Sequence, residues 1–131
     1  MGKVRWKPGT MLYPAPAVLV TSCCNGADNV LTVSWAGTVC TDPPLLSISL
    51  RPERYSYELI RSSGEFAVNI PCRPLVRAVD FCGVKSGRDI DKFEAAGLTR
   101  EQASLVSAPL IRECPVSIEC VVESETPLGS H

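Results

Sequence analysis

The sequence contains almost no histidine and none of the common nucleotide-binding loops. Its one histidine is His131, the last residue, so an H-E-x-x-H zinc motif is impossible and a Ser-His-Asp or Cys-His site would have to use the extreme terminus. Neither G-x-G-x-x-G nor G-x-x-x-x-G-K-[ST] occurs, which excludes the Rossmann and P-loop classes. Hydrolase chemistry is therefore not expected. This composition favours a protein that binds and orients a cofactor, which then carries the reaction.

Long apolar runs and an excess of one charge are also absent. The longest apolar run near the N-terminus, residues 15–20, is far shorter than the roughly 20 residues of a membrane span. The basic residues before it are interrupted by Trp6 and Pro8, so no signal peptide is expected. Thirteen basic and fourteen acidic residues give a net charge of -1 and are dispersed. We expect a cytoplasmic protein that binds neither nucleic acid nor membrane.

Cysteine is frequent, but its spacing does not indicate a metal site. The seven cysteines include no C-x-x-C pair, which argues against structural zinc. Most of them lie among Val, Ile and Phe, where a free cysteine packs as a small apolar residue. Cys40 is the exception to watch, because it falls between two predicted strands that carry a candidate ligand site.

A length of 131 residues and a hydrophobic content of 45% predict one domain, residues 1–131, with an ordinary core. Alternation and turn residues predict more strands than helices, so the predicted fold class is mainly β with short helices. The predicted strands are 18–23, a second strand that follows the turn at 25–28, then 45–50, 66–70 and 116–122. The predicted helices are 56–62, 74–81 and a short one that ends at Gly97.

Two of these strands lie within the segment 29–50 and carry small hydroxyl residues on one face. In the first strand Leu31, Val33 and Trp35 alternate with Thr32 and Ser34. In the second, after Asp42-Pro43-Pro44, the leucines and isoleucine alternate with Ser47 and Ser49. Hydroxyl groups, loop amides and the arginines at 51 and 54 then converge at one strand end. This pattern favours a bound phosphorylated cofactor over a bare core.

The last residues, 126–131, resemble a turn that leads onward. An antiparallel sheet that ends on the strand 116–122 leaves an exposed edge, which folded proteins usually pair or cover. We therefore expect further C-terminal strands beyond this chain.

Six blocks of the sequence resemble, in the same order, those of the flavin reductase-like, FMN-binding split-barrel family, and within it the flavoredoxin type. The blocks are PAPAVLVTSC, ADNVLTVSWAGTVCTDPPLLSISL, YSYELI, GEFAVNIP, SGRDIDKFEAAGLT and ECPVSIECVVESETPLGSH. The resemblance covers nearly the whole chain. It implies a six-stranded antiparallel Greek-key barrel with helices at its side, noncovalent FMN near a homodimer interface, and a chain here that lacks its C-terminal part.

The resemblance also implies site residues. Five match flavin contacts of flavoredoxin-like members: Asn29, Trp35, Ser56, Lys92 and His131. Lys92 and the Ser56 hydroxyl would bind the FMN phosphate, which needs cationic and hydrogen-bond donors. Asn29 would bond ring or ribityl oxygens, and His131 would lie at the rim of the flavin. Further candidates are Ser34, Ser49 and Arg51, with backbone N–H groups that would face the ring.

Each of these residues also has an ordinary structural alternative. Trp35 is in phase with Leu31 and Val33, so the pattern alone favours a core tryptophan. Without the resemblance, Lys92 is an exposed lysine at a helix start. Asn29 is explained by a turn after Asp28, and a terminal histidine is usually disordered.

Two versions of an FMN redox function remain open. One is a reductase that takes hydride from NADH or NADPH, and the other is an electron carrier that serves a redox partner protein. A different class is also open, namely a non-enzymatic split-barrel binding module that has lost flavin chemistry. Oxidation of pyridoxamine phosphate on a related barrel is weaker, because its arginine-rich phosphate motif is not evident.

Overall fold

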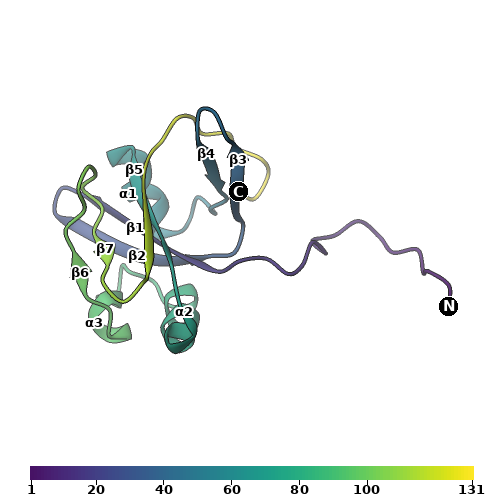
Figure 1. The fold of residues 1–131 in the computed structure, drawn as a ribbon, viewed down its shortest axis with the longest axis horizontal. Coiled ribbons are helices and arrows are strands. Elements are labelled where there is room, and N and C mark those ends of the chain that lie inside the picture. The colour runs from purple at the N-terminus through teal and green to yellow at the C-terminus, as the bar shows by residue number, and fades with distance from the viewer.

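The computed structural model describes residues 1–131 and confirms a mainly β fold with short helices (Figure 1). Its strands are β1 (Val18–Cys24), β2 (Ala27–Val33), β3 (Ala36–Cys40), β4 (Leu45–Ile48), β5 (Glu65–Ile70), β6 (Arg100–Glu101), β7 (Leu110–Ile111) and β8 (Val116–Val121). Its helices are α1 (Tyr55–Ser63), the 3-10 turn η1 (Arg73–Leu75), α2 (Val76–Val84) and α3 (Lys92–Ala96). The chain before β1 runs away from the folded body.

The central sheet has the strand order β2-β1-β5-β8, and all its pairs are antiparallel. The predicted turn at 25–28 joins β1 and β2 as an antiparallel hairpin. Its turn is Asn25-Gly26, with positive φ values of 51° and 82°, the geometry of tight hairpin turns in which Asn and Gly are favoured. β2 and β8 are the two edges of this sheet, and the outer edge of β2 is where the predicted site residue Asn29 lies.

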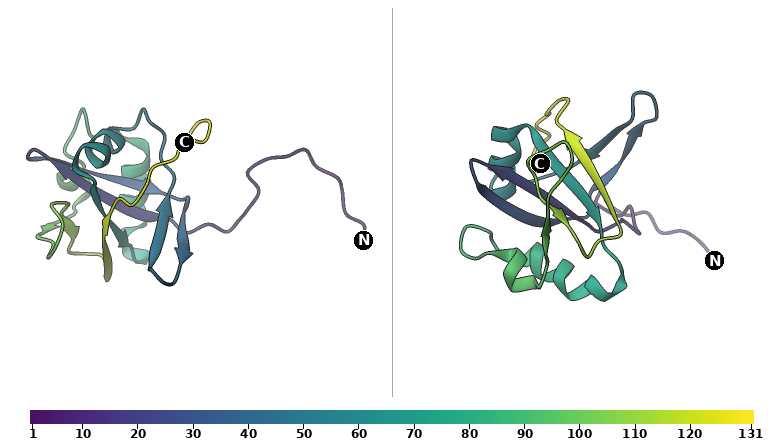
Figure 2. Two further views of the ribbon diagram at one scale, coloured as in Figure 1. Left: turned by 90° about the horizontal axis from the view of Figure 1, so that it is seen from above. Right: turned by 60° about the vertical axis from the view of Figure 1, so that its left-hand side comes forward.

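The sheet has an apolar layer on each face. On one face Leu19 and Val30 pack with α2, α3 and β7 around the buried ring of Phe93. On the other face a second cluster includes Leu31 and Ile60 and is covered by α1 and the β3–β4 hairpin. Figure 2 shows α2 and α3 together on one side of the sheet and α1 apart from them. Alternation along β1 and β2 therefore divides the core into two layers, as strand geometry requires.

The prediction of two strands in the segment 29–50 was wrong, because the structure forms three. β2 ends at Val33, the chain bends at residues 34–35, and β3 pairs with β4 as a separate hairpin. The predicted hydroxyl residues therefore do not share one continuous face. Thr32 lies on the face of the sheet that α2 covers. It donates its hydroxyl proton to the carbonyl oxygen of Val79, so it holds α2 on the sheet.

The predicted helices are present with small changes of boundary. Gly64 and Gly97 end α1 and α3 in left-handed conformations, with φ values of 71° and 70°, as expected of C-terminal glycines. The helix predicted at 74–81 continues to Val84 as α2, so Gly83 lies inside the helix and does not end it. Gly83 instead permits close packing, since a Cβ there would come 3.3 Å from Thr32 Cβ.

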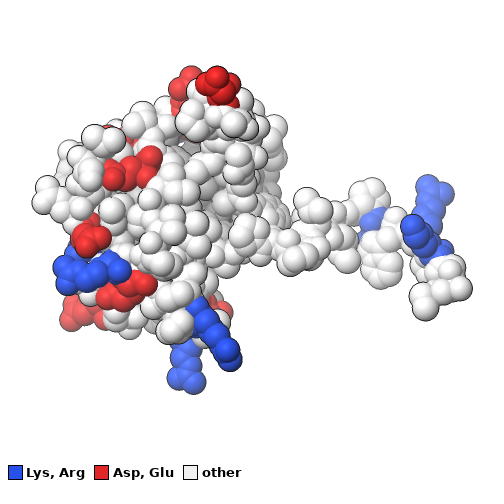
Figure 3. Space-filling model, viewed as in Figure 1, with Lys and Arg blue, Asp and Glu red and all other residues white.

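In the view of Figure 3 the charged side chains form separate small groups: acidic ones at the top, acidic and basic ones together at the lower left, and basic ones at the bottom and on the extended N-terminal segment. No helix combines the length and the hydrophobicity that a membrane crossing requires.

Candidate functional site

Asn29, Ser56 and Lys92, which are far apart in the sequence, come together at the outer edge of β2. Their exposed fractions are 3%, 0% and 2%. Asn29 comes from β2, Ser56 from the first turn of α1, and Lys92 is the first residue of α3. The Asn29 amide Nδ2 donates to Ser56 Oγ at 2.9 Å. Polar groups this deeply buried need partners, and this bond gives one to each of the two side chains.

The Lys92 ammonium group is held by backbone carbonyls. Nζ donates to the carbonyl oxygen of Val30 at 2.9 Å and to that of Cys82 at 2.8 Å. An ammonium group has three donors, so one N–H remains for another acceptor. Burial lowers the pKa of Lys92 to about 8; the nearby Cys82 thiol opposes this shift, and the positive charge of Arg54 adds to it. The alternative of an exposed helix-start lysine is therefore wrong.

Two polar cavities meet at these residues. The larger, about 380 Å³, lies between β2 and the loop before α3, and the smaller, about 190 Å³, lies between that loop and the start of α1. Four residues line both cavities: Asn29, Gly87, Arg88 and Lys92. We call these four residues, with Ser56 and Arg54, the polar pocket.

Gly87 packs against Asn29 so closely that no side chain fits there. A Cβ at this position would come 2.1 Å from Asn29 Oδ1. Real atoms do not approach so closely, so Asn29 or the loop would have to move if Gly87 were replaced. Gly87 thus fixes how near the loop before α3 lies to β2.

Two arginines add positive charge to the polar pocket. Arg54 Nη2 donates to the carbonyl oxygen of Gly83 at 2.8 Å. Arg88 Nη2 pairs with Glu58 at 2.5 Å, and its guanidinium carbon lies 5.3 Å from the centre of the Tyr55 ring. Arg88 and Gly87 were not among the predicted site residues. The signal for them was the polar, glycine-containing loop, whose neighbours in space cannot be read from spacing.

Trp35 and His131 meet at a second place. Their ring centroids are 4.7 Å apart with an interplanar angle of 42°, and we call them the stacked pair. Trp35 is 43% exposed, so the prediction of a core tryptophan was wrong. The reason is the bend at residues 34–35, which takes Trp35 out of phase with β2. His131 is half-buried, and its Nδ1 lies 2.8 Å from Ser130 Oγ.

The remaining predicted residues lie on the β3–β4 hairpin or directly beside it in the chain. Ser34 and Ser49 are exposed, and the Ser49 N–H donates to the carbonyl oxygen of Trp35 at 2.9 Å. The sequence predicted that this N–H faces the flavin ring, but it is already bonded within the protein. Arg51 is exposed and lies 3.9 Å from Glu53. Cys40 ends β3, half-buried, with its Sγ 3.5 Å from the Asp42 carbonyl oxygen.

The polar pocket contains donors of the kind that bind a phosphate monoester, although carboxylates, among them Asp28 and Asp91, also line the larger cavity. Its side chains offer a lysine N–H, an asparagine amide and two guanidinium groups at one concave place, and Gly87 brings the backbone close. Charged donors form the strongest hydrogen bonds to phosphate oxygens. The residues present thus fit the phosphate end of a flavin nucleotide, while the aromatic rings of the stacked pair fit its ring end.

Comparison with known proteins gives a consistent result. The family described as flavin reductase like domain matches residues 10–131. An uncharacterized protein of Archaeoglobus fulgidus is 34% identical over 122 residues, which cover 92% of this chain and 67% of the relative.

Two solved flavoredoxins have a similar structure. That of Desulfovibrio vulgaris (Miyazaki F) is 35% identical with a TM-score of 0.91, over 96% of this chain and 69% of that one. That of Methanosarcina acetivorans is 28% identical with a TM-score of 0.90, over 99% and 69%. These likenesses confirm the predicted split-barrel fold. The chain spans about two thirds of the length of these three relatives.

Proposed function

Because the chain belongs to the family of flavin reductase like domains, we propose that it binds FMN noncovalently and serves electron or hydride transfer between a donor and an acceptor. When bound, FMN supplies the redox chemistry at its ring system. The side chains of this protein bind the nucleotide, orient it and set the charge around it.

The observation that supports this proposal most is the meeting of Asn29, Ser56 and Lys92 beside two polar cavities. Lys92 directs its remaining N–H to the phosphate, and the carbonyls of Val30 and Cys82 hold the ammonium group in place beforehand. A donor that is already ordered loses little freedom on binding. Asn29, oriented by Ser56 and Gly87, contributes the neighbouring amide group.

The stacked pair supplies the ring end of the site. Trp35 follows Asn29 by six positions, so at 3.3 Å per residue the two residues are at most about 20 Å apart along the chain, and the bend at residues 34–35 shortens this. We place the phosphate of the nucleotide at the polar pocket and its ring at the stacked pair. Trp35 and His131 offer aromatic faces there, and stacking is the contact that a flat ring system prefers.

We further propose that the whole protein works as a cytoplasmic homodimer. The electron donor is either NADH or NADPH, in a reductase, or a protein partner, in an electron carrier. The likeness to two flavoredoxins supports the carrier version.

An absorbance spectrum of the purified protein, followed by anaerobic addition of NADH and then NADPH, tests these versions. Flavin bands that bleach with either nucleotide establish a reductase. Bands that resist both but bleach with dithionite indicate a carrier that a partner reduces. The absence of flavin bands even after FMN is added would overturn the proposal and favour the non-enzymatic binding module.

A further inference from the structure

We propose that Arg100 is a positioning residue for phosphate recognition, because it ties together the two segments that carry Asn29 and Lys92. This inference rests on the proposed function. Arg100 begins β6 and is not among the site residues predicted from the sequence. It nevertheless lines the larger cavity.

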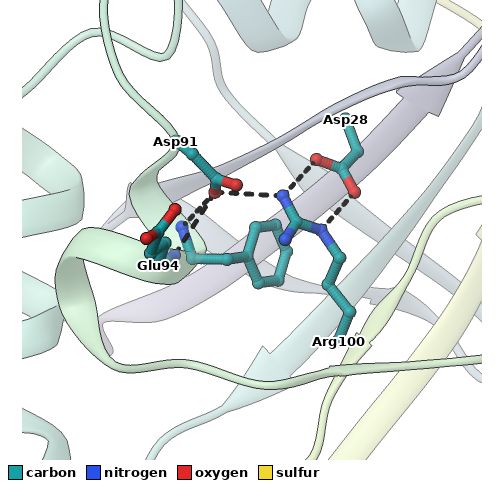
Figure 4. A network of polar contacts seen from close by, with 5 residues as sticks. Asp28, Asp91, Glu94 and Arg100 are labelled. Atoms are coloured by element: carbon teal, nitrogen blue, oxygen red, sulfur yellow. Dashed lines mark hydrogen bonds and ion pairs between the residues drawn. The ribbon is translucent and has the colours of Figure 1, made fainter.

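The guanidinium group of Arg100 bridges two carboxylates (Figure 4). Nε lies 2.6 Å from Asp28 Oδ2 and Nη2 lies 2.9 Å from Asp28 Oδ1, which is a two-point contact. Nη2 also lies 3.0 Å from Asp91 Oδ1. A planar guanidinium group can hold both carboxylates in one geometry, and the single ammonium nitrogen of a lysine cannot reproduce it.

The two carboxylates occupy informative positions in the sequence. Asp28 directly precedes Asn29 on β2, and Asp91 directly precedes Lys92. Asp91 is also the N-cap of α3, since its Oδ1 accepts from the backbone N–H groups of Phe93 and Glu94 at 3.0 and 3.3 Å. Arg100 therefore links the residue before Asn29 to the residue before Lys92. The bridge sets the separation of the two side chains that face the phosphate.

A buried ring limits how the bridge can move. The guanidinium carbon of Arg100 lies 4.2 Å from the centre of the Phe93 ring, and Phe93 is only 1% exposed. Stacking on a fixed ring holds the plane of the guanidinium group. The Arg100 side chain itself is 41% exposed, and ion pairs this accessible contribute little to folding stability. The bridge thus affects the geometry of the polar pocket more than the stability of the fold.

The test compares the affinities of FMN and riboflavin, which differ only in the phosphate, in three variants of the protein. Arg100→Lys keeps the charge and loses the planar bridge. Asp91→Asn weakens the contact with Arg100 but keeps an N-cap, because Asn caps helices as well as Asp does. Arg112→Gln is the matched control, since Arg112 is an exposed arginine on the turn after β7 that makes no side-chain hydrogen bond or ion pair.

We expect Arg100→Lys and Asp91→Asn each to lower the ratio of FMN to riboflavin affinity by about fivefold, which is less than the roughly tenfold or more for loss of a charge-assisted bond, because the phosphate donors are displaced and not removed. Riboflavin affinity and the circular dichroism spectrum should stay the same, and Arg112→Gln should match the parent. An unchanged ratio in both variants would overturn the role of Arg100, as would an equal loss of both affinities, which indicates a general structural effect. If the parent protein itself does not prefer FMN to riboflavin, the proposed function fails instead.

Discussion

The polar pocket and the stacked pair belong to one proposed site but are built in different ways. Lys92 and Ser56 are buried, and their polar atoms are bonded to groups from β2 and α2 before any ligand arrives. Trp35 lies at the surface, on a bend, and its aromatic partner His131 is only half-buried. The pocket is therefore a product of the core, whereas the stacked pair depends on a surface contact.

This difference predicts a division of tasks. A preorganised group of donors should give selectivity for a phosphate, because the donors cost little to order. An exposed aromatic pair should give moderate affinity for any flat ring, with or without a phosphate. Substitutions in the two regions should therefore affect FMN and riboflavin differently.

Lys92→Met should have the largest effect. Removal of a charged donor costs about 1.5 to 3 kcal/mol, so FMN affinity should fall roughly 10- to 100-fold while riboflavin affinity holds. Calorimetric titration measures both. Lys7→Met is the control, because Lys7 is an exposed lysine in the segment before β1 and lines neither cavity. Equal FMN affinity in parent and Lys92→Met would remove the lysine from the phosphate site.

Gly87→Ala should weaken FMN binding by about 1 to 2 kcal/mol, a typical effect of overpacking, because its Cβ would displace Asn29. Gly37→Ala on β3 is the matched control, since a Cβ there meets nothing within 4 Å. Fluorescence titration of FMN with both variants checks this. Similar affinities in the two alanine variants would show that the close contact at Asn29 has no part in binding.

The preference for FMN should also depend on pH. With the pKa of Lys92 lowered to about 8, the ammonium form that a phosphate prefers is lost as pH rises through this value. One pH unit corresponds to about tenfold in binding, so FMN affinity should fall by up to about tenfold between pH 7 and pH 9. Riboflavin affinity should change less, and Lys92→Met should abolish the difference. A parallel response of FMN and riboflavin would contradict this assignment.

The same shift has a consequence for folding. Burial disfavours the charged lysine in the folded protein, so the unfolded chain binds more protons between pH 8 and the ordinary lysine value of 10.5. The contribution of Lys92 to stability should therefore rise with pH across this interval. Urea unfolding of the flavin-free protein and of Lys92→Met at several pH values measures it as the difference between the two.

Trp35→Ala should have the smallest effect. Loss of an aromatic contact costs about 0.5 to 1.5 kcal/mol, and it should weaken FMN and riboflavin equally. The visible flavin spectrum should shift, because the environment of the ring changes. Trp6→Ala is the control, since Trp6 lies in the exposed segment before β1. A selective loss of FMN affinity in Trp35→Ala would place the phosphate near the stacked pair.

Local features of the fold could be predicted from the sequence, but most contacts of the site could not. The turn at Asn25-Gly26 and the helix ends at Gly64 and Gly97 depend on backbone angles that these residues adopt themselves. The burial of Lys92 depends on the Val30 carbonyl, which lies 62 positions away. Likewise, the contact between Arg100 and Asp28 spans 72 positions. No spacing rule connects residues so far apart, and only the family resemblance pointed to Lys92.

The bend after Val33 shows a second limit. Alternation of apolar and polar residues continues through Trp35, so the pattern predicted one longer strand. The backbone instead leaves the sheet at residue 34 to begin the β3–β4 hairpin. Pairing partners decide where a strand ends, and the side-chain pattern alone does not contain them.

The most direct test of the central claim is a paired calorimetric titration of FMN and riboflavin into the unsubstituted protein at pH 7. A pocket that holds the phosphate through Lys92 predicts that FMN binds at least about tenfold more tightly than riboflavin, the value of one charge-assisted bond. Equal affinities would contradict the account, because they would mean that the buried lysine, asparagine and serine contribute to the fold and not to phosphate recognition.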